Sequence, residues 1–197
     1  MSRLVPDVRL LLLVREPMER LRSHFQMVRR NLMGQDLDFD AYVDASDSEA
    51  AISLSDYGSQ IQCILDYFPA SSLMVVESVD LDHDRRRTIA SIFQFIGVRS
   101  DFQSPQFEER LYDRRQRRFP SPTGKQILGS LPMRVAKKVL PFTWNEALRN
   151  AVLLPFSLPE PSMALTPDRE RRLQERFAAE VALARRLTGL ALPSLGF

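Results

Sequence analysis

The chain has 197 residues, a formal net charge of +2 and one cysteine. Hydrophobic residues make up 44% and charged residues 26%, which suits a globular domain, and the small net charge gives no ground for a nucleic-acid partner. A single cysteine excludes an internal disulfide framework, and no apolar run is long enough to span a membrane. We therefore expect a cytoplasmic protein without a membrane span, in which Cys63 is a core residue.

The first expected element is a strand over residues 8–14, because six of these seven residues are apolar. A continuous apolar run indicates a strand covered on both faces, as in a parallel sheet flanked by helices. Pro17 suits the first turn of a following helix, which we expect to end before Gly34. One apolar stripe on that helix recurs every three or four positions, at Met18, Leu21, Phe25, Val28 and Leu32.

The junction between this strand and helix is a candidate anion site. Arg15 ends the strand, Glu16 and Pro17 follow, and the helix carries Ser23. Backbone N–H groups at a helix start and a guanidinium can both point at one phosphate. The residues alone fit equally well with a buried strand followed by an ordinary amphipathic helix that has Ser23 on its surface.

An acidic stretch follows over residues 36–56, with seven carboxylates and no base. Phe39 and Tyr42 indicate a short helix within it. The glycine and the terminal glutamate spacing of a calcium loop are absent, so we expect a solvated face and no metal site.

The middle of the chain shows a regular order of elements. The order strand, helix, helix, strand, helix predicts a three-layer α/β domain with a mainly parallel sheet, and we expect residues 1–197 to form a single domain. Gly97 is expected to end the third helix. The expected segments are a helix over 56–68, a turn over 69–72, a strand over 73–76 that ends at Glu77, and a helix over 85–96.

The second half of the chain is less regular. Residues 110–138 hold nine bases and one acid, and residues 153–167 hold four prolines. We expect Thr166 to cap a last helix with Pro167 in its first turn. The apolar stripe of this helix is Leu173, Phe177, Val181 and Leu187.

Four segments in this order resemble the sulfotransferases that use 3′-phosphoadenosine 5′-phosphosulfate. RLLLLVREPMERLRSHF (9–25) is similar to the family's 3′-phosphate-binding segment, and the other three segments are 55–68, 73–98 and the last helix from Leu165. The resemblance implies the sulfotransferase fold, which is like that of P-loop NTPases. It also implies transfer of a sulfuryl group from 3′-phosphoadenosine 5′-phosphosulfate, as co-substrate, to a hydroxyl or amine acceptor.

The resemblance also implies roles for particular residues. Arg15 and Ser23 would hold the 3′-phosphate, and Tyr57 would lie beside the adenine. Arg117 and Arg118 would belong to a late basic loop that closes over the nucleotide. Each residue has a structural alternative: Tyr57 as a core side chain, and the two arginines as part of a solvated surface.

The chain departs from the family pattern in its acidic turn. The family usually has Glu-Asp-Leu where this chain has Val79, Asp80 and Leu81, and Glu77 lies two residues earlier. Leu195 stands near the position of a tryptophan in many bacterial members.

A second departure concerns the start of the chain. In the family, a loop that holds the 5′-phosphosulfate precedes the 3′-phosphate segment, and here seven residues precede the first strand. We expect an N-terminally truncated member without the first βα unit. The segment SPTGKQ (121–126) is no substitute, because it lacks a preceding apolar strand and the Walker spacing.

The catalytic base is not identified by the sequence, and His24 and His83 are weak candidates. Two other functions remain open. The chain is either a catalytically inactive nucleotide-binding or partner-binding remnant, or a basic adaptor for nucleic acid. The last would show strong salt-dependent binding to any duplex.

Overall fold

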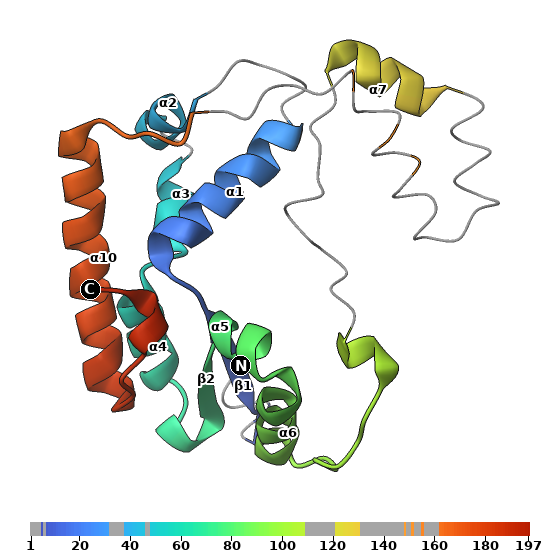
Figure 1. The fold of residues 1–197 in the computed structure, drawn as a ribbon. Coiled ribbons are helices and arrows are strands. Elements are labelled where there is room, and N and C mark those ends of the chain that lie inside the picture. Colours follow the sequence, from blue (N-terminus) through green and yellow to red (C-terminus); the bar gives the residue numbers. More distant parts are fainter. Residues whose placement is uncertain are drawn as a thin grey trace. The chain divides into compact units, whose positions relative to one another are not determined.

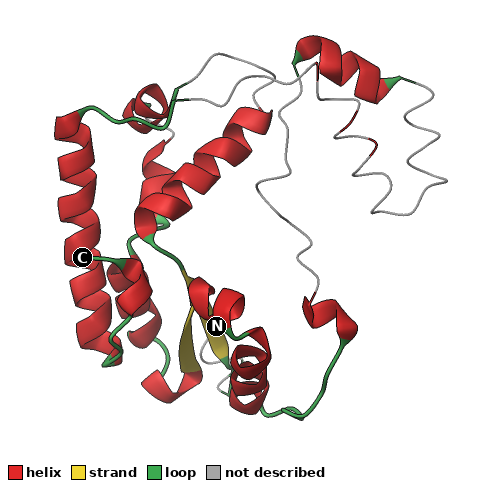
Figure 2. Cartoon of the chain, viewed as in Figure 1, coloured by secondary structure: helices red, strands yellow, loops and turns green. Residues whose placement is uncertain are grey.

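The computed structural model describes residues 5, 7–31, 38–45, 48–108, 121–130, 148, 151, 155 and 162–197. Figures 1 and 2 show helices joined to one short parallel sheet. The described elements are β1 (Leu10–Val14), α1 (Pro17–Asn31), α2 (Phe39–Asp44), α3 (Ser48–Ser53), α4 (Tyr57–Leu65), η1 (Ala70–Ser72), β2 (Leu73–Glu77), α5 (Ser78–His83), α6 (Arg85–Ile96), η2 (Pro105–Glu108), α7 (Pro122–Gly129), α10 (Pro167–Thr188) and η5 (Pro193–Leu195).

The chain divides into two compact units. One consists of residues 1–24, 43–109 and 165–197, and the other of residues 25–42 and 110–164. The single domain expected for residues 1–197 stays a prediction. None of the described helices has the length and apolar content that crossing a bilayer requires.

The first unit contains the sheet. β1 and β2 pair in parallel, with a register that runs from Leu10 opposite Leu73 to Val14 opposite Glu77. Both strands therefore end at the same edge, where parallel sheets in α/β proteins carry their ligand sites. Figure 1 shows α4 and α10 together on one side of the strands and α6 on the other. The predicted α/β arrangement with a parallel sheet is confirmed.

The core of this unit lies between the sheet and the pair α4 and α10. Alternate strand residues contribute to it, because successive side chains of a strand point to opposite faces. It joins residues from the start, middle and end of the chain, and its buried members are Val14, Tyr57, Ile61, Val181, Ala184, Leu192 and Leu195. The buried part of α10 follows the predicted stripe through Leu173, Phe177 and Val181.

The second unit contains a contact between three aromatic rings. The ring of Phe25, from α1, lies 5.4 Å from that of Phe39 and 5.2 Å from that of Tyr42. Both Phe25 and Phe39 are completely buried.

Ser121 caps α7 by accepting a hydrogen bond from the Gly124 N–H. The segment 121–126 thus opens a capped helix, as an N-terminal Ser-Pro pair favours.

Two sequence predictions about burial are wrong. β1 was expected to be covered on both faces, but Leu11 and Leu13 are 47% and 51% exposed. Leu12 and Val14 pack against the core while their neighbours point away from it, so the apolar run does not mean burial on both sides. Cys63 was expected in the core and is exposed, because it lies on the outer face of α4.

The residues expected to end or cap helices agree only partly with the structure. Gly97 ends α6 in the left-handed conformation with φ of 79°, as predicted. Thr166 occupies the N-cap position of α10, but its side chain makes no capping hydrogen bond. Its carbonyl accepts hydrogen bonds from the N–H groups of Arg169 and Glu170 instead.

Candidate functional site

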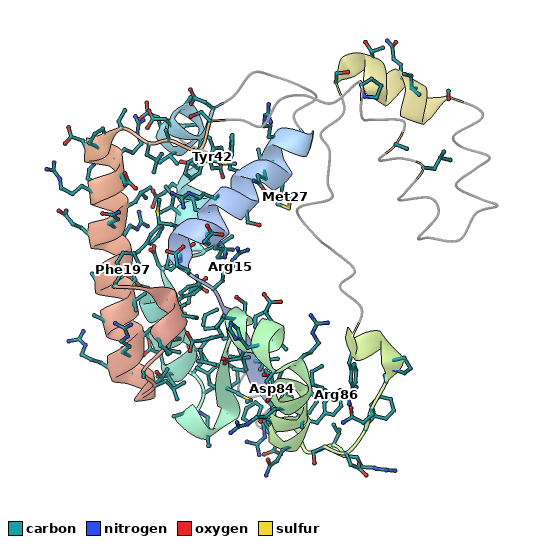
Figure 3. All side chains as sticks on the ribbon, viewed as in Figure 1. Arg15, Met27, Tyr42, Asp84, Arg86 and Phe197 are labelled. Atoms are coloured by element: carbon teal, nitrogen blue, oxygen red, sulfur yellow. The ribbon has the colours of Figure 1, made fainter. Side chains whose placement is uncertain are left out.

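The junction of β1 and α1 places Arg15 at the carboxyl edge of the sheet, and Figure 3 labels it there. Its guanidinium lies 2.8 Å from Oε2 of Glu19, one turn along α1, and the Arg15 side chain is 33% exposed. The four-residue spacing brings the Arg15 guanidinium, just before α1, to a carboxylate in the first turn of the helix. The guanidinium that the sequence predicts as an anion ligand is therefore paired with a carboxylate in the first turn of α1.

The backbone amides at the start of α1 also have a carboxylate partner. The two carboxylate oxygens of Glu16 accept hydrogen bonds from the N–H groups of Met18, at 2.9 Å, and Glu19, at 2.6 Å. Pro17 has no N–H to satisfy. Glu16 thus acts as the N-cap of α1 and occupies donors that the sequence offered to a phosphate.

Ser23 lies on the same side of α1 as Glu19, since four residues separate them. It is half-buried. The structure therefore places Glu19 between the two predicted phosphate ligands, Arg15 and Ser23, along the helix.

Tyr57 begins α4 and is 2% exposed. Its hydroxyl accepts a hydrogen bond from the backbone N–H of Arg15 at 3.2 Å, while its ring belongs to the core. Burial, the largest effect, raises the pKa of Tyr57 above its usual value of 10.0. The observed contact is structural, and the expected position beside an adenine stays a prediction.

Arg20 has a different environment from Arg15. Its guanidinium donates hydrogen bonds to the carbonyl of Ala51 at 3.2 Å and to Oγ of Ser55 at 3.4 Å. These contacts hold α1 against the end of α3. Arg20 thus has a structural function beside the candidate site.

Glu77 ends β2 at the same sheet edge and is 8% exposed. Its Oε2 accepts hydrogen bonds from the Ser194 N–H, at 2.7 Å, and from the Ser194 hydroxyl. Glu77 therefore anchors the segment that places Leu195, which is completely buried, in the core. The hydrogen bonds to Ser194 account for the burial of the Glu77 carboxylate, so no bound ligand is needed to explain it.

The two histidines differ in their surroundings. His24 is half-buried on α1, and His83 is exposed at the end of α5. Burial, and after it the Arg20 guanidinium, lowers the pKa of His24 below its usual value of 6.5. Two further predicted nucleotide contacts, Arg117 and Arg118, lie outside the described residues.

A cavity of about 530 Å³ lies at the other end of β2. Its lining is mainly apolar and comes from α4, η1, β2, α6 and the end of α10. Leu65, Leu73, Phe95, Leu187 and Leu190 are among the lining residues, whereas Arg15, Ser23 and Tyr57 are not. The cavity is separate from the carboxyl edge of the sheet.

Comparison with known proteins identifies the family to which the chain belongs. The model of the sulfotransferase domain family matches residues 2–125, and the chain belongs to this family. Among solved structures, the chain is similar to the sulfotransferase of Alicyclobacillus acidocaldarius, with a TM-score of 0.58 and 18% identity. The match covers 99% of this chain and 60% of that one. The search of curated proteins found no match.

These findings confirm the predicted family and its α/β fold. The sequence did not reveal that Glu16 and Glu19 pair with the donors of the candidate site. The spacing of Arg15 and Glu19 was an available signal, because opposite charges four residues apart on a helix meet. Pro17 also signalled the helix start, and negative charge is favourable beside the N-terminus of a helix, so the position of Glu16 was an available signal.

Proposed function

We propose that this chain functions in sulfuryl transfer from 3′-phosphoadenosine 5′-phosphosulfate to a hydroxyl or amine acceptor. The observation that carries the proposal is the position of Arg15 at the carboxyl edge of a parallel sheet, directly before α1. Ser23 follows on the same helix. The family match over residues 2–125 includes this junction and supports the same function.

In this proposal, Arg15 and Ser23 bind the 3′-phosphate of the nucleotide. A guanidinium donates two parallel hydrogen bonds to a phosphate, and a serine hydroxyl adds a third donor. Tyr57 contributes near the adenine, and Arg117 and Arg118 cover the bound nucleotide. These contacts fix the nucleotide, and with it the position of the transferable group.

Sulfuryl transfer and phosphoryl transfer have similar catalytic requirements. An acceptor oxygen or nitrogen attacks sulfur in line with the departing phosphate, and charge builds up on the leaving group. Catalysis therefore needs positioning and electrostatic stabilisation at the 5′-phosphosulfate as well as at the 3′-phosphate. The solved relative is longer than this chain, which spans 60% of it.

Calorimetric titration with adenosine 3′,5′-bisphosphate tests the nucleotide site. We expect the wild-type chain to bind, and Arg15→Ala to weaken binding about ten- to a hundred-fold, because a charge-assisted contact is worth roughly 1.5–3 kcal/mol. Ser23→Ala should cost less, since its hydroxyl is neutral. Arg171→Ala is the control, because Arg171 lies on the exposed side of α10 in an ion pair with Asp168.

A second assay separates binding from turnover. The chain is incubated with radiolabelled 3′-phosphoadenosine 5′-phosphosulfate and a panel of hydroxyl and amine acceptors, and the release of adenosine 3′,5′-bisphosphate is followed. Acceptor-dependent release that Arg15→Ala reduces supports the enzyme. Binding without any release would favour a nucleotide-binding protein that lacks turnover, and a folded wild-type chain that fails to bind would contradict the nucleotide site itself.

A further inference from the structure

Glu19 lies between two arginines of the candidate site. Its Oε2 is 2.8 Å from the Arg15 guanidinium, and its Oε1 is 3.7 Å from Nη1 of Arg22. Arg15, directly before α1, lies four residues before Glu19, and Arg22 lies three residues after it, so both guanidinium groups reach the same carboxylate. One carboxylate thus stands between two cations.

The two arginines are not equally satisfied. Arg15 makes a hydrogen bond to Glu19, whereas the 3.7 Å separation at Arg22 is too long for one. In addition, the Nε of Arg22 is a buried donor without a hydrogen-bond partner among the described residues. A buried donor that lacks an acceptor is unfavourable, so this atom favours an acceptor from outside the protein.

We propose that Arg22 is a further phosphate-binding residue, and that the phosphate takes the place of Glu19 between Arg15 and Arg22. This inference rests on the proposed function, because it concerns the same 3′-phosphate. A phosphate monoester carries up to two negative charges and three acceptor oxygens, and a carboxylate carries one charge and two oxygens. The phosphate therefore satisfies both guanidinium groups and the Ser23 hydroxyl together.

The arrangement at the helix start agrees with this assignment. Glu16 accepts the N–H groups of Met18 and Glu19, so these amides already have an acceptor. The contacts to a phosphate then come from side chains on the face of α1 that carries Arg22 and Ser23. Glu19 is a resident competitor on that face, and its charge sets how tightly the phosphate binds.

Two substitutions have opposite expected effects on affinity. Arg22→Gln removes a cation and should weaken binding of adenosine 3′,5′-bisphosphate about tenfold or more. Glu19→Gln removes the competing charge and should tighten binding several-fold. Adenosine 5′-monophosphate, which has no 3′-phosphate, should respond to neither substitution. A specific loss for the bisphosphate therefore locates the effect at the 3′-phosphate.

The experiment is calorimetric titration of wild type, Arg22→Gln, Glu19→Gln and Arg15→Ala at one fixed ionic strength. Arg171→Gln is the matched control, because it removes a cation from another (i, i+3) ion pair on an exposed helix face. Arg22→Lys, which keeps the charge and loses the planar fork, should bind more tightly than Arg22→Gln. If Arg22→Gln does not fold, Arg22→Lys replaces it as the test of the Arg22 side chain.

The outcomes separate this inference from the proposed function. If wild type binds in an Arg15-dependent way and the Arg22 variants bind equally well, the inference is wrong and the nucleotide site stands. Glu19→Gln binding that is weaker than wild type would overturn the competitor function, since Glu19 would then be holding Arg15 in place. If folded wild type does not bind the bisphosphate, both the site and this inference are overturned.

Discussion

The Tyr57 hydroxyl accepts a hydrogen bond from the backbone N–H of Arg15, so a buried side chain of α4 fixes the end of β1. The donor belongs to the residue whose guanidinium faces Glu19. A core side chain thus holds the backbone from which the candidate phosphate ligand extends. Packing in the core and the geometry of the site are coupled through this one contact.

Tyr57→Phe removes the acceptor and keeps the ring. We expect a loss of about 1 kcal/mol in the free energy of unfolding, because the Arg15 N–H loses its partner. Urea denaturation, followed by circular dichroism, measures this change in the free energy of unfolding. Tyr67→Phe is the control, since Tyr67 is 68% exposed. Equal stability of the two variants would show that the hydrogen bond contributes nothing.

Gly58→Ala tests the close approach of α4 to α10. A Cβ at Gly58 would lie 2.5 Å from the carbonyl oxygen of Glu180 and 2.7 Å from Cβ of Leu183. The helices must separate to admit a methyl group, and such overpacking costs roughly 1–3 kcal/mol. Chemical denaturation gives the value.

Gly129→Ala is the matched substitution for this test. Gly129 lies at the end of α7, and a Cβ added there would have no atom of the described residues within 4 Å. The same change there should leave stability equal or slightly higher, because alanine favours a helix over glycine. A tolerated Gly58→Ala would contradict the tight packing of α4 on α10.

The lowered pKa of His24 predicts a pH dependence of stability. Between pH 6.5 and its lowered pKa in the folded chain, His24 stays mainly neutral in the folded chain, whereas in the unfolded chain it already binds a proton. The free energy of unfolding therefore rises with pH in this window. As the pH falls from 6.5 toward the lower pKa of the folded state, protonation of His24 in the unfolded chain lowers it. His24→Gln should flatten this part of the profile.

Thermal unfolding between pH 5 and 8 measures the profile of each variant. His83→Gln is the control, because His83 is exposed and belongs to the short helix α5. A His24→Gln profile that runs parallel to the wild-type profile across the whole range would show that burial of His24 does not couple folding to protonation.

Elements with a strong local pattern were predicted well from the sequence. The helix expected over residues 85–96 has the bounds Arg85–Ile96, because its apolar residues recur with the helical period and Gly97 ends it. The strand before Glu77 and the long last helix follow from similar signals. By contrast, α3 and α5 were not predicted: each has six residues, and neither has an aromatic pair like the one that indicated the equally short α2.

Contacts between distant residues set the limit of the sequence analysis. Glu77 and Ser194 are 117 positions apart, and no local pattern connects them. The exposure of Leu11 and Leu13 likewise depends on which elements cover the sheet. An apolar run predicts a strand, but it does not say which elements pack on each face of that strand. Arg15 and Ser23 are candidate ligands from the sequence alone, whereas the proposal for Arg22 depends on its distance from the Glu19 carboxylate.

The core described for the first unit has a consequence for biosynthesis. Val14, Tyr57 and Ile61 find their partners in Val181 and Leu195, near the other end of the chain. During translation, the early apolar side chains emerge long before the segment that covers them is made. Because long-range contacts of this kind form late, the apolar side chains of β1 and α4 stay exposed on the nascent chain until α10 has been synthesised.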